Sequence, residues 1–360
     1  MKTLSILLFT GILLSSCTDD KVTNPDGTPI PPGEDNNNQD SEWLIPKNEV
    51  RDGGPGKDGI PAISSPDFGS AGEINYLNDD DLVLGFADGE DVRAYPHSIL
   101  DWHEIINDET KNHSLAIIYC PLTGTGIGWD RVVDGKETTF GVSGLLYNTN
   151  IIPYDRETDS NWSQLLLKSV NGELKGAKAK TYNLLETTWK TWKQMYPSTK
   201  VVTTKTGYNR NYGRYPYGNY KTSDNLIFPV SNNDPRLKPK ERVLGVILNE
   251  RAKVYKFFKG NTDNTVTGDV FEGQKLIVVK NAEANFIVAF KRELADETEL
   301  IFEAVQNEFP VVLKDNEGTK WDVFGRGISG PRQGEHLETV PQMMGYWFSF
   351  AAFYPDVEIK

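Results

Sequence analysis

Two residues whose side chains can bind metals or take part in reactions, His103 and Cys120, lie close together in the sequence. A thiolate and an imidazole are ligands that suit zinc and copper, and a cysteine can also serve as a redox thiol or a nucleophile. Helical angles place His103 on the same face as Ile99 and Ile106, so its imidazole should point into the core. The pair predicts a metal or thiol site with copper or zinc as cofactor, and a third ligand would have to come from afar, such as His336 or a carboxylate. The alternatives are a hydrogen-bonded core histidine and an inert buried cysteine.

The opposite face of the same helix carries His97, Asp101 and Glu104. We expect these three side chains to be solvated, because they lie away from the apolar stripe. His97 and Asp101 stand four positions apart and would form an ordinary surface pair. Serine hydrolysis has little support, because Ser143 lies in Gly-Val-Ser-Gly and not in the G-x-S-x-G turn of that chemistry.

A second candidate site combines aromatic and charged side chains further along the chain: Tyr147, Asp155, Arg156 and Trp162. An arginine beside carboxylates can organise a hydrogen-bonded network at a pocket wall. The alternative is a surface loop held together by ion pairs.

Residues 208–220 form an unusual loop in which tyrosines alternate with Arg, Asn, Gly and Pro. Such a loop could cover a pocket or stack on sugar rings, or it could pack on itself at the surface. A carbohydrate-binding role would require its tyrosines to lie exposed on one face.

Short apolar strands separated by turn residues position these side chains. Asp88-Gly89 and Asp134-Gly135 indicate hairpins. We find no repeat period. Helices are expected at 98–107, 185–196 and 341–353, and strands at 82–86, 92–95, 115–120, 127–133, 137–142, 243–248, 252–258, 276–279, 286–290 and 300–305. The pattern predicts an α+β fold, a predominantly antiparallel β-sheet with a few short helices, in a single globular domain from 43 to 360.

The first sixteen residues are typical of a lipoprotein signal peptide. Lys2 precedes an apolar run at 4–14, and Leu14-Ser15-Ser16-Cys17 forms a lipobox in which Cys17 receives lipid. Residues 17–42 are rich in Asn, Asp and Pro, as expected of a flexible tether. The alternatives are an ordinary secretory signal and a short membrane anchor. We therefore expect an exported cell-envelope protein that is bound to a membrane by its N-terminal lipid.

The net charge and the number of cysteines exclude some classes of function. The 360-residue chain has a formal net charge of -13, which disfavours nucleic-acid binding because phosphate backbones are repelled. Of its two cysteines Cys17 would carry lipid, so Cys120 would have no disulfide partner.

Several motifs occur in a fixed order: Tyr95-Pro96, Trp102-His103-Glu104, Tyr119-Cys120-Pro121-Leu122, Gly124-Thr125, Phe140-Gly141-Val142-Ser143-Gly144-Leu145, Tyr154-Asp155-Arg156, Trp321, Gly325, Gly330-Pro331, Gly334, Leu337, Trp347-Phe348 and Phe353-Tyr354-Pro355-Asp356. Together they resemble the bacterial domain of unknown function 3179 family, from about Asp58 to the C-terminus. The resemblance implies one continuous exported domain and says little about a reaction. Many members carry a second cysteine where this chain has Thr123, so the dithiol of a thioredoxin-like role is absent here.

Two functions remain open at this point. The first is a binding or structural lipoprotein of the cell envelope with a pocket near Cys120 and Arg156, whose partner is a small molecule, a glycan or an envelope protein. The second is a metal- or thiol-dependent envelope enzyme that uses Cys120 and His103. A sulfur and an imidazole nitrogen more than about 8 Å apart could not share a metal, because metal–ligand bonds are only about 2.0–2.3 Å long.

Overall fold

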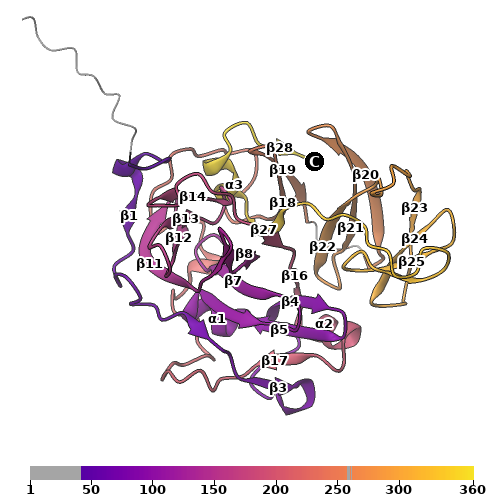
Figure 1. Ribbon diagram of the computed structural model, residues 1–360, viewed down its shortest axis with the longest axis horizontal. Coiled ribbons are helices and arrows are strands. Elements are labelled where there is room, and N and C mark those ends of the chain that lie inside the picture. The colour runs from indigo at the N-terminus through magenta and orange to yellow at the C-terminus, as the bar shows by residue number, and fades with distance from the viewer. Residues whose placement is uncertain (1–41, 258–259, 261) are drawn as a thin grey trace, which may run out of the picture. The chain divides into compact units, whose positions relative to one another are not determined.

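The computed structural model describes residues 42–257, 260 and 262–360, and in these ranges short β-strands dominate beside three α-helices (Figure 1). Most strand pairs are antiparallel, which confirms the predicted fold class. Residues 43–360 form one compact unit. The predicted signal peptide and Cys17 lie outside the described residues. No helix in the described ranges has the length and apolar character needed to cross a membrane.

The main elements occur twice. In each half, a β-hairpin is flanked by an antiparallel strand on one side and a parallel strand on the other. The first half has the order β16 (Leu185–Thr188), β4 (Leu82–Asp88), β5 (Asp91–Pro96), β17 (Lys200–Val202). The second half has the order β27 (Gln342–Tyr346), β18 (Arg242–Leu248), β19 (Arg251–Lys256), β28 (Glu358–Ile359).

The strand registers of the two halves correspond residue by residue. Leu185 faces Gly85 in the first half, and Met343 faces Gly245 in the second. Ala94 likewise pairs with Val201 where Val254 pairs with Ile359, in the same parallel direction. The structure therefore contains an internal duplication, and the sequence-based conclusion that the chain has no repeat is wrong. The repeat is not visible in the sequence because strands pair through backbone groups, so the two halves can have the same strand pairing with different side chains.

Two further groups of strands are also duplicated. A three-stranded meander is formed by β6 (Ile105–Glu109), β7 (Ser114–Cys120) and β8 (Thr125–Asp130), and again by β20 (Thr265–Phe271), β21 (Gln274–Asn281) and β22 (Phe286–Lys291). Four further strands follow in each half: β11 (Phe140–Tyr147), β12 (Asn150–Asp155), β13 (Asn161–Ser163) and β14 (Lys168–Asn171), then β23 (Phe302–Ala304), β24 (Val311–Asp315), β25 (Lys320–Asp322) and β26 (Gly327–Ser329).

The remaining elements are short. They are η1 (Lys47–Glu49), β1 (Arg51–Asp52), β2 (Ile63–Ser64), β3 (Phe68–Ser70), η2 (Ala71–Glu73), β9 (Val132–Val133), β10 (Lys136–Glu137), β15 (Thr181–Tyr182) and η3 (Tyr220–Thr222).

Each of the three α-helices continues directly from a strand. They are α1 (His97–His103) after β5, α2 (Trp189–Met195) after β16 and α3 (Trp347–Phe353) after β27. The helices predicted at 185–196 and 341–353 were therefore too long at their N-terminal ends, because pairing with β4 and β18 holds their first residues extended. The helix predicted at 98–107 ends at His103, where Glu104 adopts φ 58° and the chain enters β6.

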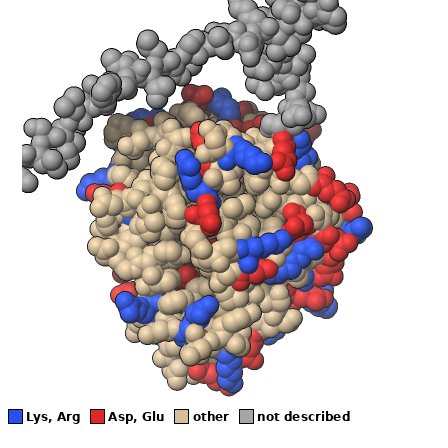
Figure 2. Space-filling view, turned by 90° about the vertical axis from the view of Figure 1, so that its left-hand side faces the viewer, with Lys and Arg blue, Asp and Glu red and all other residues tan. Residues whose placement is uncertain are grey.

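The two halves share a core. One buried cluster joins Trp189 and Trp192 of α2 to Phe286 of β22 and Trp321 of β25. Another joins β7 and β8 to α3, and contains Cys120. On the face shown in Figure 2, basic and acidic side chains are interspersed and no continuous basic surface is visible.

Candidate functional site

The charged face of α1 is buried. His97, Asp101 and Glu104 are only 5%, 5% and 6% exposed, so the prediction that they are solvated is wrong. Helical angles identified the face correctly but could not show what lies over it. A glutamate of β16 and a long loop after β17 cover this side of the helix.

An arginine and a glutamate from different halves form the centre of the cluster. Arg242 of β18 bonds Glu186 of β16 and donates a second hydrogen bond to the carbonyl oxygen of Gly124 at 2.7 Å. Burial lowers the pKa of the Arg242 guanidinium, but the carboxylate of Glu186 and its neighbours outweigh that effect, so the pKa is raised overall. The arginine therefore carries charge at every physiological pH.

His97 lies against this ion pair as a neutral imidazole. Its Nε2 is 3.4 Å from Oε2 of Glu186, and its ring centroid is 4.5 Å from that of Tyr119. Burial lowers the pKa of His97 well below its ordinary value, and the cations of Lys221 and Arg242 lower it further. The imidazole can therefore exchange hydrogen bonds here without carrying charge.

The tyrosine loop, residues 208–223, covers one side of α1 and directs three tyrosine hydroxyls and the ammonium of Lys221 inward. Tyr217 donates a hydrogen bond to Oε1 of Glu104 at 3.1 Å, and Lys221 donates one to Oδ2 of Asp101 at 2.9 Å. Tyr215 and Tyr220 donate to the carbonyl oxygens of Pro121 and Leu122. The exposed aromatic face that sugar stacking would require is therefore not formed by these tyrosines.

The loop is attached to the rest of the protein through side chains. Its backbone N–H groups at Arg214, Tyr220, Thr222 and Ser223 bond carbonyl oxygens within the loop itself. Contacts that depend on side chains can open without disrupting a sheet, so we expect the loop to open more easily than the strands, with the buried ring of Tyr220 as its strongest attachment to the core. The loop has the construction of a cover.

Four buried polar atoms in the cluster have no hydrogen-bond partner among the residues that the structure describes. They are Nε2 of His97, Oγ of Ser98, Oδ1 of Asp101 and Oε2 of Glu186, of which the first and the last lie 3.4 Å from each other without the geometry of a hydrogen bond. An unpaired buried polar group costs about 1–3 kcal/mol, and most native structures pair such groups. Four of the eight such atoms among the described residues lie on α1 and the adjacent β16, which makes this cluster the candidate site.

Two carboxyl groups in the cluster have pKa values close to neutral pH. Burial raises the pKa of Asp101 to about 6, against the lowering effect of Lys221. Burial also raises the pKa of Glu104 to about 7, against the hydrogen bond from Tyr217 and with a contribution from Asp101. Shifts of this size are common at functional sites.

The raised pKa of Glu104 predicts a pH-dependent stability. A carboxyl group whose pKa is higher in the folded state stabilises the fold below its unfolded pKa, and this contribution is lost as the pH rises through about 7. Glu104→Gln keeps an acceptor for Tyr217 and removes the titration. We expect the variant to gain about 2 kcal/mol of unfolding free energy relative to the parent between pH 5 and pH 8, measured by urea denaturation. The exposed Glu109→Gln serves as control, and a Glu104→Gln curve parallel to that of the parent would contradict the prediction.

The two residues of the predicted metal or thiol site have structural roles: His103 is hydrogen-bonded and Cys120 is packed in the core. Nδ1 of His103 donates to the carbonyl oxygen of Pro61 and Nε2 accepts from the hydroxyl of Tyr212, both at 2.7 Å. Both ring nitrogens are therefore occupied, as in a core histidine. In the described ranges no three His, Cys, Asp or Glu residues lie close enough to hold a metal ion, and His336 is exposed.

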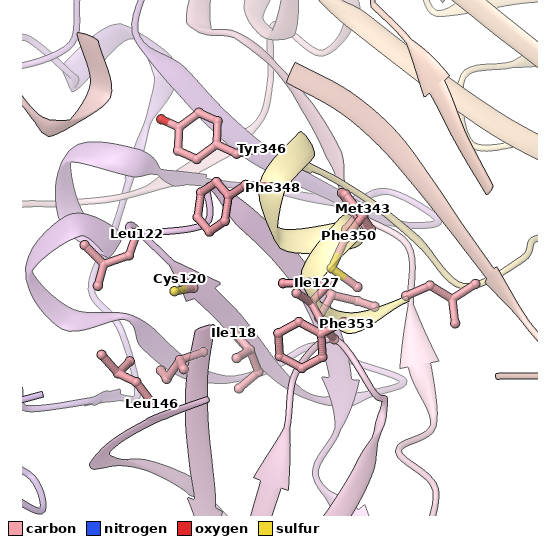
Figure 3. Packing of buried hydrophobic residues seen from close by; sticks show 14 of the residues in the cluster. Ile118, Cys120, Leu122, Ile127, Leu146, Met343, Tyr346, Phe348, Phe350 and Phe353 are labelled. Atoms are coloured by element: carbon pink, nitrogen blue, oxygen red, sulfur yellow. The ribbon is translucent and has the colours of Figure 1, made fainter. Parts of the chain in front are cut away.

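Cys120 lies at the end of β7 among apolar side chains such as Ile118, Leu122 and Phe353 (Figure 3). Its sulfur contacts the carbonyl oxygen of Thr149 at 3.7 Å. Burial, and then the nearby Glu104, raise the pKa of the thiol to about 11. The thiol therefore stays protonated at neutral pH, so it is a poor nucleophile and has the character of a packing residue.

The four residues of the other predicted pocket do not gather around one cavity. Trp162 donates to Oδ2 of Asp155 at 2.9 Å in the core, and Arg156 pairs with Asp58 at 2.8 Å on a partly exposed surface. Tyr147 packs on Phe353, with ring centroids 5.2 Å apart. Trp162 lines a cleft of about 340 Å³ that includes none of the other three residues.

The duplication distinguishes structural from functional polar groups. The bond from Trp162 to Asp155 recurs in the second half as Trp321 to Asp315, also at 2.9 Å, which marks it as part of the fold. The charged cluster does not recur. By strand register, Phe257, Met344 and Leu82 stand where the cluster has His97, Glu186 and Arg242. The same architecture is therefore built without these charges.

Glu186 and Arg242 were not identified from the sequence. Glu186 belongs to a short strand with one leucine and two threonines and Arg242 begins an apolar strand, and the signal was the charge at a position that is apolar in the other half. That signal becomes visible only once the two halves are aligned by their strand register.

Comparison with known proteins adds a family and no activity. No curated protein and no solved structure is similar enough to the chain to count as a match. Residues 57–357 match the family described as "protein of unknown function (DUF3179)". The match covers both halves of the duplication, as well as α1, the tyrosine loop and Arg242. The chain is a member of this family of proteins of unknown function.

Proposed function

We propose that the protein is a lipid-anchored binding protein of the cell envelope, which holds a small polar ligand in the buried cluster beneath the tyrosine loop. The observation that carries the proposal is the set of four unpartnered polar atoms on α1 and β16. A ligand that supplied hydrogen bonds to these atoms would remove a cost of about 1–3 kcal/mol for each.

The duplication supports this function over a structural role. By strand register, Phe257 and Met344 of the second half correspond to His97 and Glu186, and Leu82 of the first half corresponds to Arg242, so the same architecture forms without these charges. Buried ion pairs are often no better for stability than apolar pairs of similar size. Because buried charges often bring no gain in stability, we expect these charges to recognise a ligand.

Envelope anchoring rests on the sequence, through the lipobox that ends at Cys17. A ligand-binding unit attached by an N-terminal lipid would work at the membrane surface without entering the bilayer. The binding role is favoured over thiol or metal chemistry because Cys120 is a protonated, buried thiol and His103 has both nitrogens engaged.

The proposal is tested by capturing a ligand from the native cell. The full-length protein in detergent is incubated with a small-molecule extract of its host, separated by gel filtration, denatured and analysed by mass spectrometry. We expect a compound retained near stoichiometrically by the parent and lost from the Glu186→Met/Arg242→Leu variant. Equal retention by both proteins, or by neither, would overturn the proposal.

A further inference from the structure

We propose that the buried cluster recognises a primary ammonium group, and that Lys221 of the tyrosine loop presents such a group to it in the structure. This inference deepens the binding function proposed above and rests on it. It names the chemical class of the ligand, a small alkylammonium compound, and identifies Lys221 as its competitor within the chain.

The contacts of Lys221 reveal what the cluster accepts. Its Nζ lies 2.9 Å from Oδ2 of Asp101 and 4.1 Å from the ring centroid of Tyr215. A carboxylate combined with an aromatic face is a common way to hold an ammonium ion, because the face of the ring carries negative potential. The carboxylate belongs to the rigid helix α1, whereas the ammonium comes from the loop. The receptor is therefore fixed and the cation is movable.

The cluster has more hydrogen-bond acceptors than Lys221 satisfies. Oδ1 of Asp101 and Oε2 of Glu186 can only accept when ionised. Oδ1 is buried without a partner among the described residues, and Oε2 has only Nε2 of His97 beside it, at 3.4 Å and outside hydrogen-bond geometry. An ammonium group has three N–H donors. A ligand that is not tied to the loop backbone could direct them at several of these acceptors, and the neutral His97 could add a further bond.

The charges of the cluster also disfavour the opposite class of ligand. An anion would face Asp101, Glu104 and Glu186, and a like charge in a buried site is strongly unfavourable. Arg242 offers little compensation because its guanidinium already bonds Glu186 and the carbonyl oxygen of Gly124. A neutral alcohol would satisfy fewer acceptors and would not balance the carboxylates.

When the tyrosine loop opens, it admits a ligand and withdraws Lys221 from the cluster in the same movement. The loop is attached through its tyrosine hydroxyls and Lys221, and through Trp102 and Lys240, which donate hydrogen bonds to its carbonyl oxygens; lifting the loop therefore removes the ammonium from Asp101. Ligand and Lys221 then compete for the same carboxylate. Removing the charge of Lys221 is expected to raise the affinity for an external amine.

The test is calorimetric titration of the full-length protein in detergent near pH 7.5 with butylammonium, and with 1-butanol and butyrate as neutral and anionic probes. We expect Lys221→Met to bind butylammonium roughly tenfold more tightly than the parent, a difference of about 1.4 kcal/mol. Lys205→Met, which removes an exposed lysine nearby, should behave like the parent. Adding Asp101→Asn to Lys221→Met should abolish binding.

Butanol or butyrate binding as tightly as the amine would overturn the ammonium assignment, as would no binding of the amine by a folded Lys221→Met protein. If that variant does not fold, hydrogen exchange of the parent decides: butylammonium should accelerate exchange at the amides of Tyr220 and Thr222, and unchanged rates would overturn the inference. Capture of an uncharged compound from the host extract would contradict the ammonium assignment and would still support the binding function. Capture of no compound would contradict both.

Discussion

Replacing Arg242 by Met should lower the free energy of unfolding by about 3 kcal/mol or more, because it leaves Glu186 buried and unpaired. The side chain of Glu186 is only 4% exposed, so water cannot take over the role of the guanidinium. The measurement is equilibrium denaturation in urea. Arg251→Met is a matched control on the neighbouring strand: this arginine is half exposed in its ion pairs, and its loss should cost no more than about 1 kcal/mol.

The corresponding double variant should recover that loss. Glu186→Met with Arg242→Leu introduces the residues that the duplication places at these positions, Met344 and Leu82. Because apolar pairs often replace buried ion pairs without loss, we expect an unfolding free energy within about 1 kcal/mol of the parent or above it. A double variant as unstable as Arg242→Met would show that the fold itself needs the charged pair, contrary to our account.

Alanine at Gly85 or Gly245 should be the most damaging of the small substitutions. A Cβ atom at Gly85 would lie 2.1 Å from the indole of Trp192, and one at Gly245 would lie 2.0 Å from the ring of Phe350. Both rings are fully buried, so neither can move aside. Overpacking of this kind costs about 1–3 kcal/mol and occasionally more, and we expect a loss at the upper end or beyond for each variant.

Gly72→Ala is the control for both glycine variants, because nothing lies within 4 Å of the added methyl group. Its urea midpoint should stay close to that of the parent, since surface substitutions usually fall within about 0.5 kcal/mol. Similar midpoints for all three alanine variants would contradict the close helix–strand packing that both halves share.

The fold class followed from the sequence because alternating apolar residues and Asp-Gly turns are local signals. The turn at Asp134-Gly135 and the strand that ends at Cys120 lie where the sequence predicted them, and the first hairpin turns one residue later than predicted, at Gly89-Glu90. The ends of the helices at 185–196 and 341–353 did not follow, since pairing with β4 and β18 decides where strand becomes helix. Local periodicity cannot show this pairing.

The site was predicted less well, for a physical reason. The sequence focused attention on the helix that contains His103, but the residue that faces the apolar stripe proved to be a hydrogen-bonded core histidine. The functional candidates are on the other face, where His97 and Asp101 are buried by Glu186 and by the tyrosine loop. Partners that come from more than eighty positions away leave no trace in helical periodicity.

Hydrogen exchange in the tyrosine loop tests most directly whether the buried cluster is a covered binding site. The loop is attached by side chains, so its amides at Arg214, Tyr220 and Thr222 should exchange through an opening that requires much less free energy than global unfolding. Amides of β7 at Ile117 and Ile118 should exchange only on global unfolding, because they lie in the central strands of a sheet. Loop amides protected as strongly as those of β7 would mean that the loop is a permanent wall of the core, and would contradict the account.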